Sequence, residues 1–345
     1  MSALSDQVVS IAILVYLVAM IAHAVEYALG NTRTMSRAAT PARELVGVGA
    51  GAASGVGAAD AEAASGDAGA SGAGASGGAA FGGAGGSGAK APGNRARLAG
   101  RIAVVVTGLG ALLHLAALVT RGIAASRMPW GNLYEFVLTV SFIGVAAWLV
   151  VLWKVPSLRR LGLFLTLVQV LLLATAELVL YVPIVPLVPA LNSYWFIVHV
   201  STVVFASGIF LLGAVPAIAF LMRNGFEQGK RSFPYTMAKR LPAAASLERL
   251  TFGLHAFAFP VFTFGVIAGA IWAEAAWGRP WGWDPKEVWS FISWVVYAGY
   301  LHARATPSVK RNVAAWLAVL GFLTMLMNLF GVNIFFEGLH SYGGL

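Results

Sequence analysis

Four tryptophans lie within the thirteen residues of WGRPWGWDPKEVW, residues 277–289. Trp277, Trp281 and Trp283 do not follow helical spacing, so the segment is more than the start of the helix that includes Trp289. One or two indoles at a membrane interface serve as an anchor. Four indoles among glycines and prolines exceed that need, because flat aromatic faces beside small residues suit a flat apolar ligand. We therefore predict ligand binding by these four tryptophans.

The charged residues of the same segment suggest two different roles. Arg279 and Lys286 could neutralise acidic substituents on such a ligand. Asp284 and Glu287 are candidates for hydrogen bonding and for shaping the loop, and we include Asp284 with the tryptophans as a ligand-binding candidate. The segment contains no side chain that we interpret as a nucleophile or a general base, so no catalytic residue is predicted.

Histidines are the next candidates, because the chain has no cysteine and a metal site must use histidine, methionine or carboxylate. His199 and His340 lie at the ends of separate apolar runs, on the same side as the tryptophan loop. Two neutral imidazoles on different helices can ligate one iron from opposite faces. For His23, His114 and His255 we favour the alternative that a histidine in a helix bundle only bonds across helices.

Membrane-spanning helices must position these residues. The chain of 345 residues is 59% hydrophobic and 11% charged, with a mean hydropathy of +0.78. Runs of about 20 apolar residues can cross a bilayer core of about 30 Å. Eight such runs lie at about 7–28, 99–120, 132–153, 161–182, 195–222, 249–273, 288–304 and 313–335. The predicted fold is all-α, a polytopic integral membrane helix bundle of about eight transmembrane helices.

The basic residues predict the orientation of this bundle. If the N-terminus is outside, inner segments contain 19 of the 23 lysines and arginines. The four others are Arg121, Arg127, Arg279 and Lys286. The positive-inside rule then places both termini outside the cell membrane. This topology accounts for the net charge of +9 without a nucleic-acid partner, and anionic lipid is the expected partner of the inner face.

The first 98 residues divide into an anchor and a linker. Ala22-His23-Ala24 imitates a signal-peptide cleavage site, but no basic residue precedes the long apolar run, so residues 1–30 are predicted as an uncleaved anchor. Residues 47–93 are almost entirely Gly, Ala and Ser, which favours disorder. We therefore predict a cytoplasmic linker at 31–98 and a membrane domain at 99–345, with the tryptophan loop at 274–288.

Four more segments accompany the loop: PWGNLYEF (129–136), VPALNSYWFIVHV (188–200), FPVFTFGVIAGAIWA (259–273) and GVNIFFEGLHSY (331–342). Together with WGRPWGWDPKEVW they resemble the CcsA/ResC family of system II cytochrome c biogenesis, haem-handling proteins with a tryptophan-rich WWD signature. Members are labelled CcsB in some actinobacteria. The resemblance covers about residues 100–345. Eight predicted spans favour this family over its system I relatives, of which one is shorter and one much longer.

The resemblance implies that the chain carries haem b across the membrane, or to its outer face, for covalent attachment to apocytochrome c. His199 and His340 match the family's external axial ligands of a haem held on the WWD loop. His302 matches the transmembrane histidine of an inner haem site, whose second ligand comes from a companion membrane protein of the CcsB/ResB type. The chain would be the haem-handling subunit of a cytochrome c synthase in the plasma membrane. Whether it is itself an enzyme stays open.

Haem has two acidic substituents, and a charged group at the bilayer centre costs about 2.5–3.5 kcal/mol even on the lenient insertion scale. Glu287 and His302 are fifteen residues apart, about 22 Å along one helix, which would connect the loop with the inner histidine. We expect haem to be received near His302 and then held between His199 and His340. His23 and His255 lie at similar depth to His302 and are alternative partners for it.

Two other functions fit parts of this pattern. A transporter of haem, or of another amphipathic small molecule, would also use buried polar residues and Gly/Pro-rich spans, without any role in attachment. A cytochrome b subunit with permanent haem would place a pair of histidines face to face within the bundle. His199 and His340 instead flank a loop at the ends of their helices, which favours cytochrome c biogenesis.

Overall fold

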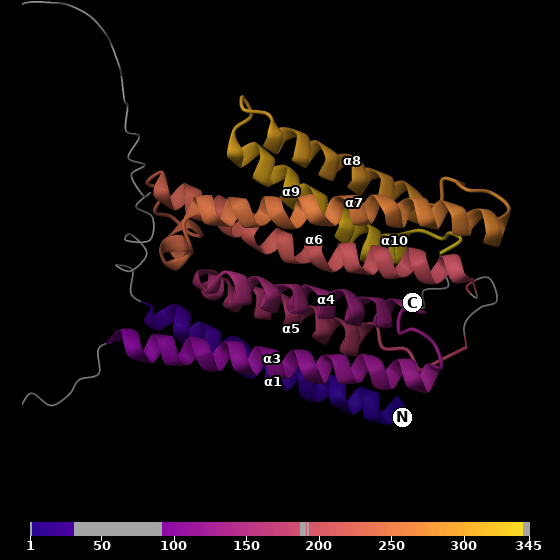
Figure 1. Ribbon diagram of the computed structural model, residues 1–345, viewed down its shortest axis with the longest axis horizontal. Helices are drawn as coiled ribbons and strands as arrows, with labels where there is room; N and C mark the ends of the chain where they lie inside the picture. Colours follow the sequence, from indigo (N-terminus) through magenta and orange to yellow (C-terminus); the bar gives the residue numbers. More distant parts are fainter. Residues whose placement is uncertain (1, 31–91, 187–190, 192, 341–345) are drawn as a thin grey trace, which may run out of the picture. The chain divides into compact units, whose positions relative to one another are not determined.

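A computed structural model describes residues 2–30, 92–186, 191 and 193–340 (Figure 1). The secondary structure of these residues is helical, and no strand occurs among them. With the apolar helices of membrane-spanning length described below, the prediction of an all-α, polytopic membrane protein is confirmed. The linker predicted at 31–98 lies outside the described residues as far as residue 91, and residues 92–98 belong to a helix.

Eight long helices each contain or overlap one of the eight predicted apolar runs. They are α1 (Ser2–Leu29), α3 (Pro92–Ala125), α4 (Leu133–Lys154), α5 (Gly162–Val179), α6 (Tyr194–Glu227), α7 (Ala244–Trp277), α8 (Pro285–Ala305) and α9 (Arg311–Leu326). A π-helical turn, η4 (Met327–Gly331), continues α9 into α10 (Val332–Phe335). Two short 3₁₀ helices, η1 (Pro156–Leu161) and η3 (Tyr235–Arg240), precede α5 and α7.

Seven helical segments of the described chain are long and apolar enough to cross a membrane, and α8 is the one predicted span outside that set. Its 21 residues would reach about 31 Å, so its length is sufficient. Its composition differs, because Ser293, Tyr297 and Tyr300 form part of its buried face and polar residues are frequent along it. The location of both termini outside the membrane stays a prediction.

Helix α6 is the most enclosed of the seven spans and packs against α4, α7 and α9. Figure 1 shows α1 and α3 side by side, with α4 and α5 between this pair and α6. Two glycines allow the close approach of α6 to its neighbours. A Cβ on Gly208 would lie 2.6 Å from a side-chain carbon of Ile143, and one on Gly213 would lie 2.5 Å from the ring of His255. Small residues at membrane-helix interfaces permit this packing.

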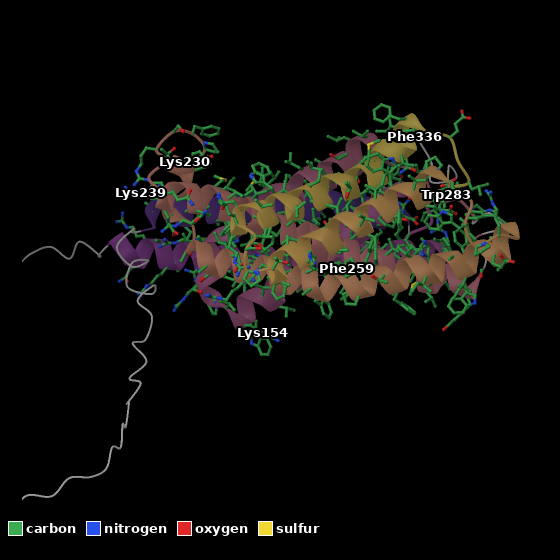
Figure 2. The ribbon with its side chains drawn as sticks, turned by 90° about the horizontal axis from the view of Figure 1, so that it is seen from above. Lys154, Lys230, Lys239, Phe259, Trp283 and Phe336 are labelled. Carbon is green, nitrogen blue, oxygen red and sulfur yellow. The ribbon has the colours of Figure 1, made fainter. Side chains whose placement is uncertain are left out.

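The two ends of the helix bundle have different surfaces. Figure 2 shows Lys230 and Lys239 at one end and Trp283 and Phe336 at the other. We call these the basic end and the tryptophan end. The tryptophan end contains the α7–α8 loop and the segment that joins α3 to α4. The candidate site lies there.

Candidate functional site

His199 and His340 meet at one indole, that of Trp272. His199 on α6 stacks on Trp272 of α7, with ring centroids 6.0 Å apart and an interplanar angle of 18°. His340, after α10, meets the same indole at 6.2 Å and 68°, and also contacts Trp277 at 5.2 Å. Two histidines separated by 141 positions in the sequence are therefore brought to one site.

Hydrogen bonds fix the orientation of both imidazole rings. Nδ1 of His199 donates to the carbonyl oxygen of Gly265 at 2.7 Å, and Nδ1 of His340 donates to Oδ1 of Asp284 at 2.7 Å. When Nδ1 bears the proton of a neutral imidazole, the lone pair is on Nε2. Histidines that ligate metals usually donate their other nitrogen to a carbonyl or a carboxylate in this way. Both rings therefore have the tautomer that iron ligation needs.

A cavity of about 230 Å³ lies beside these rings, and both histidines line it. Four indoles contribute to its wall: Trp130, Trp272, Trp277 and Trp281. Most of the remaining wall is apolar and includes Phe196, Phe210, Phe262, Phe322 and Met325 from helices α6, α7 and α9. Such a cavity, with a few polar groups in a mostly apolar wall, is typical of a site for an aromatic ligand.

The tryptophan loop obtains its shape from the ends of two helices. Helix α7 ends at Trp277, and Gly278 follows in the left-handed conformation with φ 70°. Helix α8 begins with a capping box, in which Asp284 accepts from the N–H of Lys286. The carboxylate of Glu287 accepts from the backbone N–H groups of Gly282, at 2.8 Å, and Asp284, at 3.1 Å. Both carboxylates of the loop therefore hold its backbone, as their types suggested.

Asp284 also holds the segment after α10 against the loop. Its Oδ2 accepts from the N–H of Leu339 at 2.6 Å, and its Oδ1 accepts from His340. Burial would raise the pKa of this carboxyl, but the hydrogen bond from His340, the charge of that ring when it is protonated, and the backbone N–H groups of Lys286 and Leu339 lower the pKa overall. Asp284 does not line the cavity itself. Its contacts make it a residue that positions His340.

The four tryptophans of the loop do not have equivalent positions. Trp277 and Trp281 line the cavity, whereas Trp283 and Trp289 do not. Trp283 is 71% exposed and has φ 57°, a left-handed conformation that is uncommon outside glycine. Its ring meets the edge of Trp281 at 5.8 Å. Of the five ligand-binding candidates in the loop, the structure brings two to the cavity.

Two indoles of the cavity wall, Trp130 and Trp272, were not among the predicted site residues. Each lies in a segment that carried the family resemblance, 129–136 or 259–273, and that was the available signal. Trp130 precedes Asn132, which caps α4 by accepting from the N–H of Glu135 at 2.9 Å. The capped start of α4 thus fixes the segment that brings Trp130 to the cavity.

His302 lies apart from this site, on an exposed face of α8. His255 is buried against Tyr297 and Tyr300, with ring centroids 5.3 and 4.9 Å away. His23 is buried beside Thr107. Within the part of the chain that the structure describes, no ring contact or hydrogen bond joins His302 to either alternative partner. Its exposure leaves it accessible to a ligand or to another chain.

Comparison with known proteins places this site in a family. Residues 130–340 match the family model described as cytochrome c assembly protein. Cytochrome c biogenesis protein CcsA of Guillardia theta is 35% identical over 242 residues, covering 66% of this chain and 80% of that protein. CcsA of Pyropia yezoensis is 34% identical over 301 residues, covering 72% and 93%.

One solved structure, titled cytochrome c haem lyase CcmF, matches with a TM-score of 0.55 and 16% identity. The match covers 99% of this chain and 48% of CcmF, so this chain spans about half the length of that protein and shares its fold. The interval matched by the family model runs from Trp130 to His340 and therefore contains all the indoles and histidines of the cavity wall.

Proposed function

Because this chain belongs to the cytochrome c assembly protein family, and to its CcsA members in cytochrome c biogenesis, we propose that it holds haem b between His199 and His340 and presents it to apocytochrome c. One observation carries the proposal. Two imidazoles from separate parts of the chain converge on Trp272, beside an aromatic cavity, and each has its Nδ1 proton fixed by a hydrogen bond.

Different residues of the site would bind different parts of haem. His199 and His340 would supply the axial nitrogens, since Nε2 of each neutral ring has the lone pair. Trp130, Trp272 and Trp281 provide flat apolar surface for the macrocycle. Asp284 would act through His340, because a carboxylate that accepts from Nδ1 orients the ring and increases its basicity.

Presentation of haem is mainly a matter of position. Thioether formation joins the haem to thiols of the cytochrome, and this chain has no cysteine of its own. A haem held at the tryptophan end would bring the two reactants together and convert a bimolecular encounter into a nearly intramolecular one. Axial ligation by two histidines would also influence the redox state of the iron.

His302 is proposed as an inner haem-binding position, which haem would occupy before it reaches the cavity. Its exposure on α8 is compatible with a second axial ligand from another chain, and we propose a companion membrane protein of the CcsB/ResB type as the source. Haem would pass from this position along α8 to the cavity, so that its acidic groups avoid the bilayer centre. The plasma membrane is the proposed location.

Co-expression with apocytochrome c and the companion protein tests the function. We expect the purified chain to retain b-type haem and the cytochrome to become covalently haemylated only when this chain is present. Haem supplied from the outer side separates presentation from simple transport. A transporter would become dispensable under that condition, whereas a presenting protein would still be required. Retained haem that never reaches the cytochrome would indicate a permanent cytochrome b cofactor and would exclude the proposal.

A further inference from the structure

Lys286 is a basic residue of the cavity wall that forms no ion pair with a carboxylate of the described residues. Its side chain lines the cavity, and its Nζ donates to the backbone carbonyl of Asn328 in the π-helical turn η4 at 3.1 Å. Among the described residues, no carboxylate oxygen lies within 4.0 Å of this Nζ. Lys286 is partly buried, and a partly buried charge with no counter-charge in contact is less favourable than one in water, so this arrangement favours binding of an anion.

Neighbouring carboxylates form no ion pair with Lys286, although Asp284 lies close enough for its charge to act on the ammonium group and Glu287 lines the same cavity. Glu287 accepts two backbone N–H groups of the loop, and Asp284 accepts from His340, Leu339 and the backbone N–H of Lys286. Both are therefore used for the geometry of the site. Since an ammonium group has three N–H donors and Asn328 receives one, Lys286 has donors left for a further acceptor.

Arg279 is the other basic residue of the loop, and its position differs. It is exposed and does not line the cavity. Its guanidinium lies over Gly282, where an added Cβ would be 2.3 Å from the guanidinium carbon. Among the described residues that line the cavity, Lys286 is the only lysine or arginine. The structure thus distinguishes between the two cations that the sequence left equivalent.

We propose that Lys286 binds an acidic substituent of the ligand in this cavity, a carboxylate on an otherwise flat and apolar molecule. This inference rests on the proposed function, in which the ligand is haem b and the carboxylate is one of its propionates. The imidazoles would then determine where the iron lies, and Lys286 would determine how the macrocycle is rotated within the cavity. That rotation decides which edge of haem faces the incoming cytochrome.

A titration of the haem-free purified chain in detergent tests this inference, with haem and haem dimethyl ester as the two ligands. Esterification removes the carboxylate charges and retains the iron and the ring. We expect the ester to bind the unchanged chain about tenfold more weakly or worse, because hydrogen bonds to charged groups contribute about 1.5–3 kcal/mol. In Lys286→Gln, the affinity for haem should fall by a similar factor. Esterification should then lower the affinity of this variant little further.

Two matched variants separate this role from a structural one. Lys286→Arg should keep the preference for haem over its ester, and Arg279→Gln should leave both affinities unchanged. If Lys286→Gln lowers the affinities for haem and for its ester equally, Lys286 only holds α8 against η4 and the inference is wrong. If the unchanged chain binds neither ligand with a two-histidine spectrum, the proposed haem site itself fails, and this result is distinguishable from the first.

Discussion

Glu135 and Asp284 are both buried carboxylates at the tryptophan end, and each holds a connecting segment in place, but their partners differ. Glu135 accepts from two arginines, with 3.0 Å to Nε of Arg121 and 2.6 Å to a terminal nitrogen of Arg127. Asp284 has an imidazole as its side-chain partner, that of His340, and its other acceptor bonds are to backbone N–H groups.

This difference distinguishes a carboxylate that stabilises the fold, Glu135, from one that belongs to the candidate site, Asp284. Around Glu135 the charged groups compensate one another, and Arg121 is itself buried and also contacts Asp6. Around Asp284 the chain of contacts leads through His340 to the cavity wall. Similar carboxylates therefore serve two purposes, and removal of one should affect the folded state while removal of the other should affect ligand binding. The following predictions test that distinction.

The largest expected effect is on stability, from Glu135→Gln. This change leaves Arg121 buried without its principal counter-charge, and breaking a buried ion pair costs about 3–5 kcal/mol. Thermal unfolding in detergent should show a strongly destabilised protein. Glu227→Gln is the matched control, because its pair with Arg223 is partly exposed and contributes about 0.3–0.5 kcal/mol. Equal stability of the two variants would contradict a scaffold role for Glu135.

The second effect is the loss of a proposed axial ligand. His199→Gly and His340→Gly should each lower haem retention and cytochrome c yield, since each removes a ring that lines the cavity. Added imidazole should partly restore both, because it can occupy the space of the lost side chain. His302→Gly should reduce the haem that reaches the cavity, since we propose that haem binds at His302 before it reaches the cavity.

His114→Gly is the control for this imidazole rescue. His114 is buried and contacts Gln169 and Phe142, away from the cavity lining. Any loss caused by this variant should therefore not respond to imidazole. Haem spectra and cytochrome yields equal to those of the unchanged chain in both His199→Gly and His340→Gly would exclude the two-histidine site.

Asp284→Ala should have a smaller effect than loss of His340, because it removes the orienting bond and keeps the ligand. Loss of an outer-shell partner typically lowers metal affinity by about 10–100-fold. A haem titration of the folded Asp284→Ala protein should show a loss of affinity in this range. The haem affinity of Asp284→Asn should lie between those of Asp284→Ala and the unchanged chain. If Asp284→Ala unfolds the protein as readily as Glu135→Gln, the proposed contrast between the two carboxylates does not hold.

Much of the fold was predictable because bilayer length and apolar composition alone define spans. All eight apolar runs correspond to helices, and α8 differs in polarity because its buried face contains Ser293, Tyr297 and Tyr300. The meeting of His199 and His340 followed from their common side and from the family resemblance. The bond from Asp284 to His340 crosses 56 positions and depends on how two loops pack, which no local pattern specifies.

The roles of individual indoles were harder to predict for the same reason. Trp272 looked like an ordinary apolar residue of a span, because its place between two histidines is set by the packing of α6 against α7. Trp281 and Trp283 looked equivalent in the sequence. The backbone at Trp283 has a positive φ just before the cap of α8, and it directs that side chain to an exposed position. Spacing alone does not contain this information.

The smallest effect we predict comes from this pair of tryptophans. Trp281→Ala removes an indole from the cavity wall and should weaken haem binding by about 5–30-fold, which is about 1–2 kcal/mol and the lower part of the range of about 1–3 kcal/mol for base-sized aromatic stacking. Trp283→Ala should change it less, because the ring is exposed and reaches the cavity only through its contact with Trp281. Both variants should remain inserted and folded. Haem titrations of the two proteins in the same detergent make the comparison. A larger loss in Trp283→Ala would mean that haem, or the cytochrome, contacts the exposed surface of the loop, and the ligand platform would then extend beyond the cavity described above.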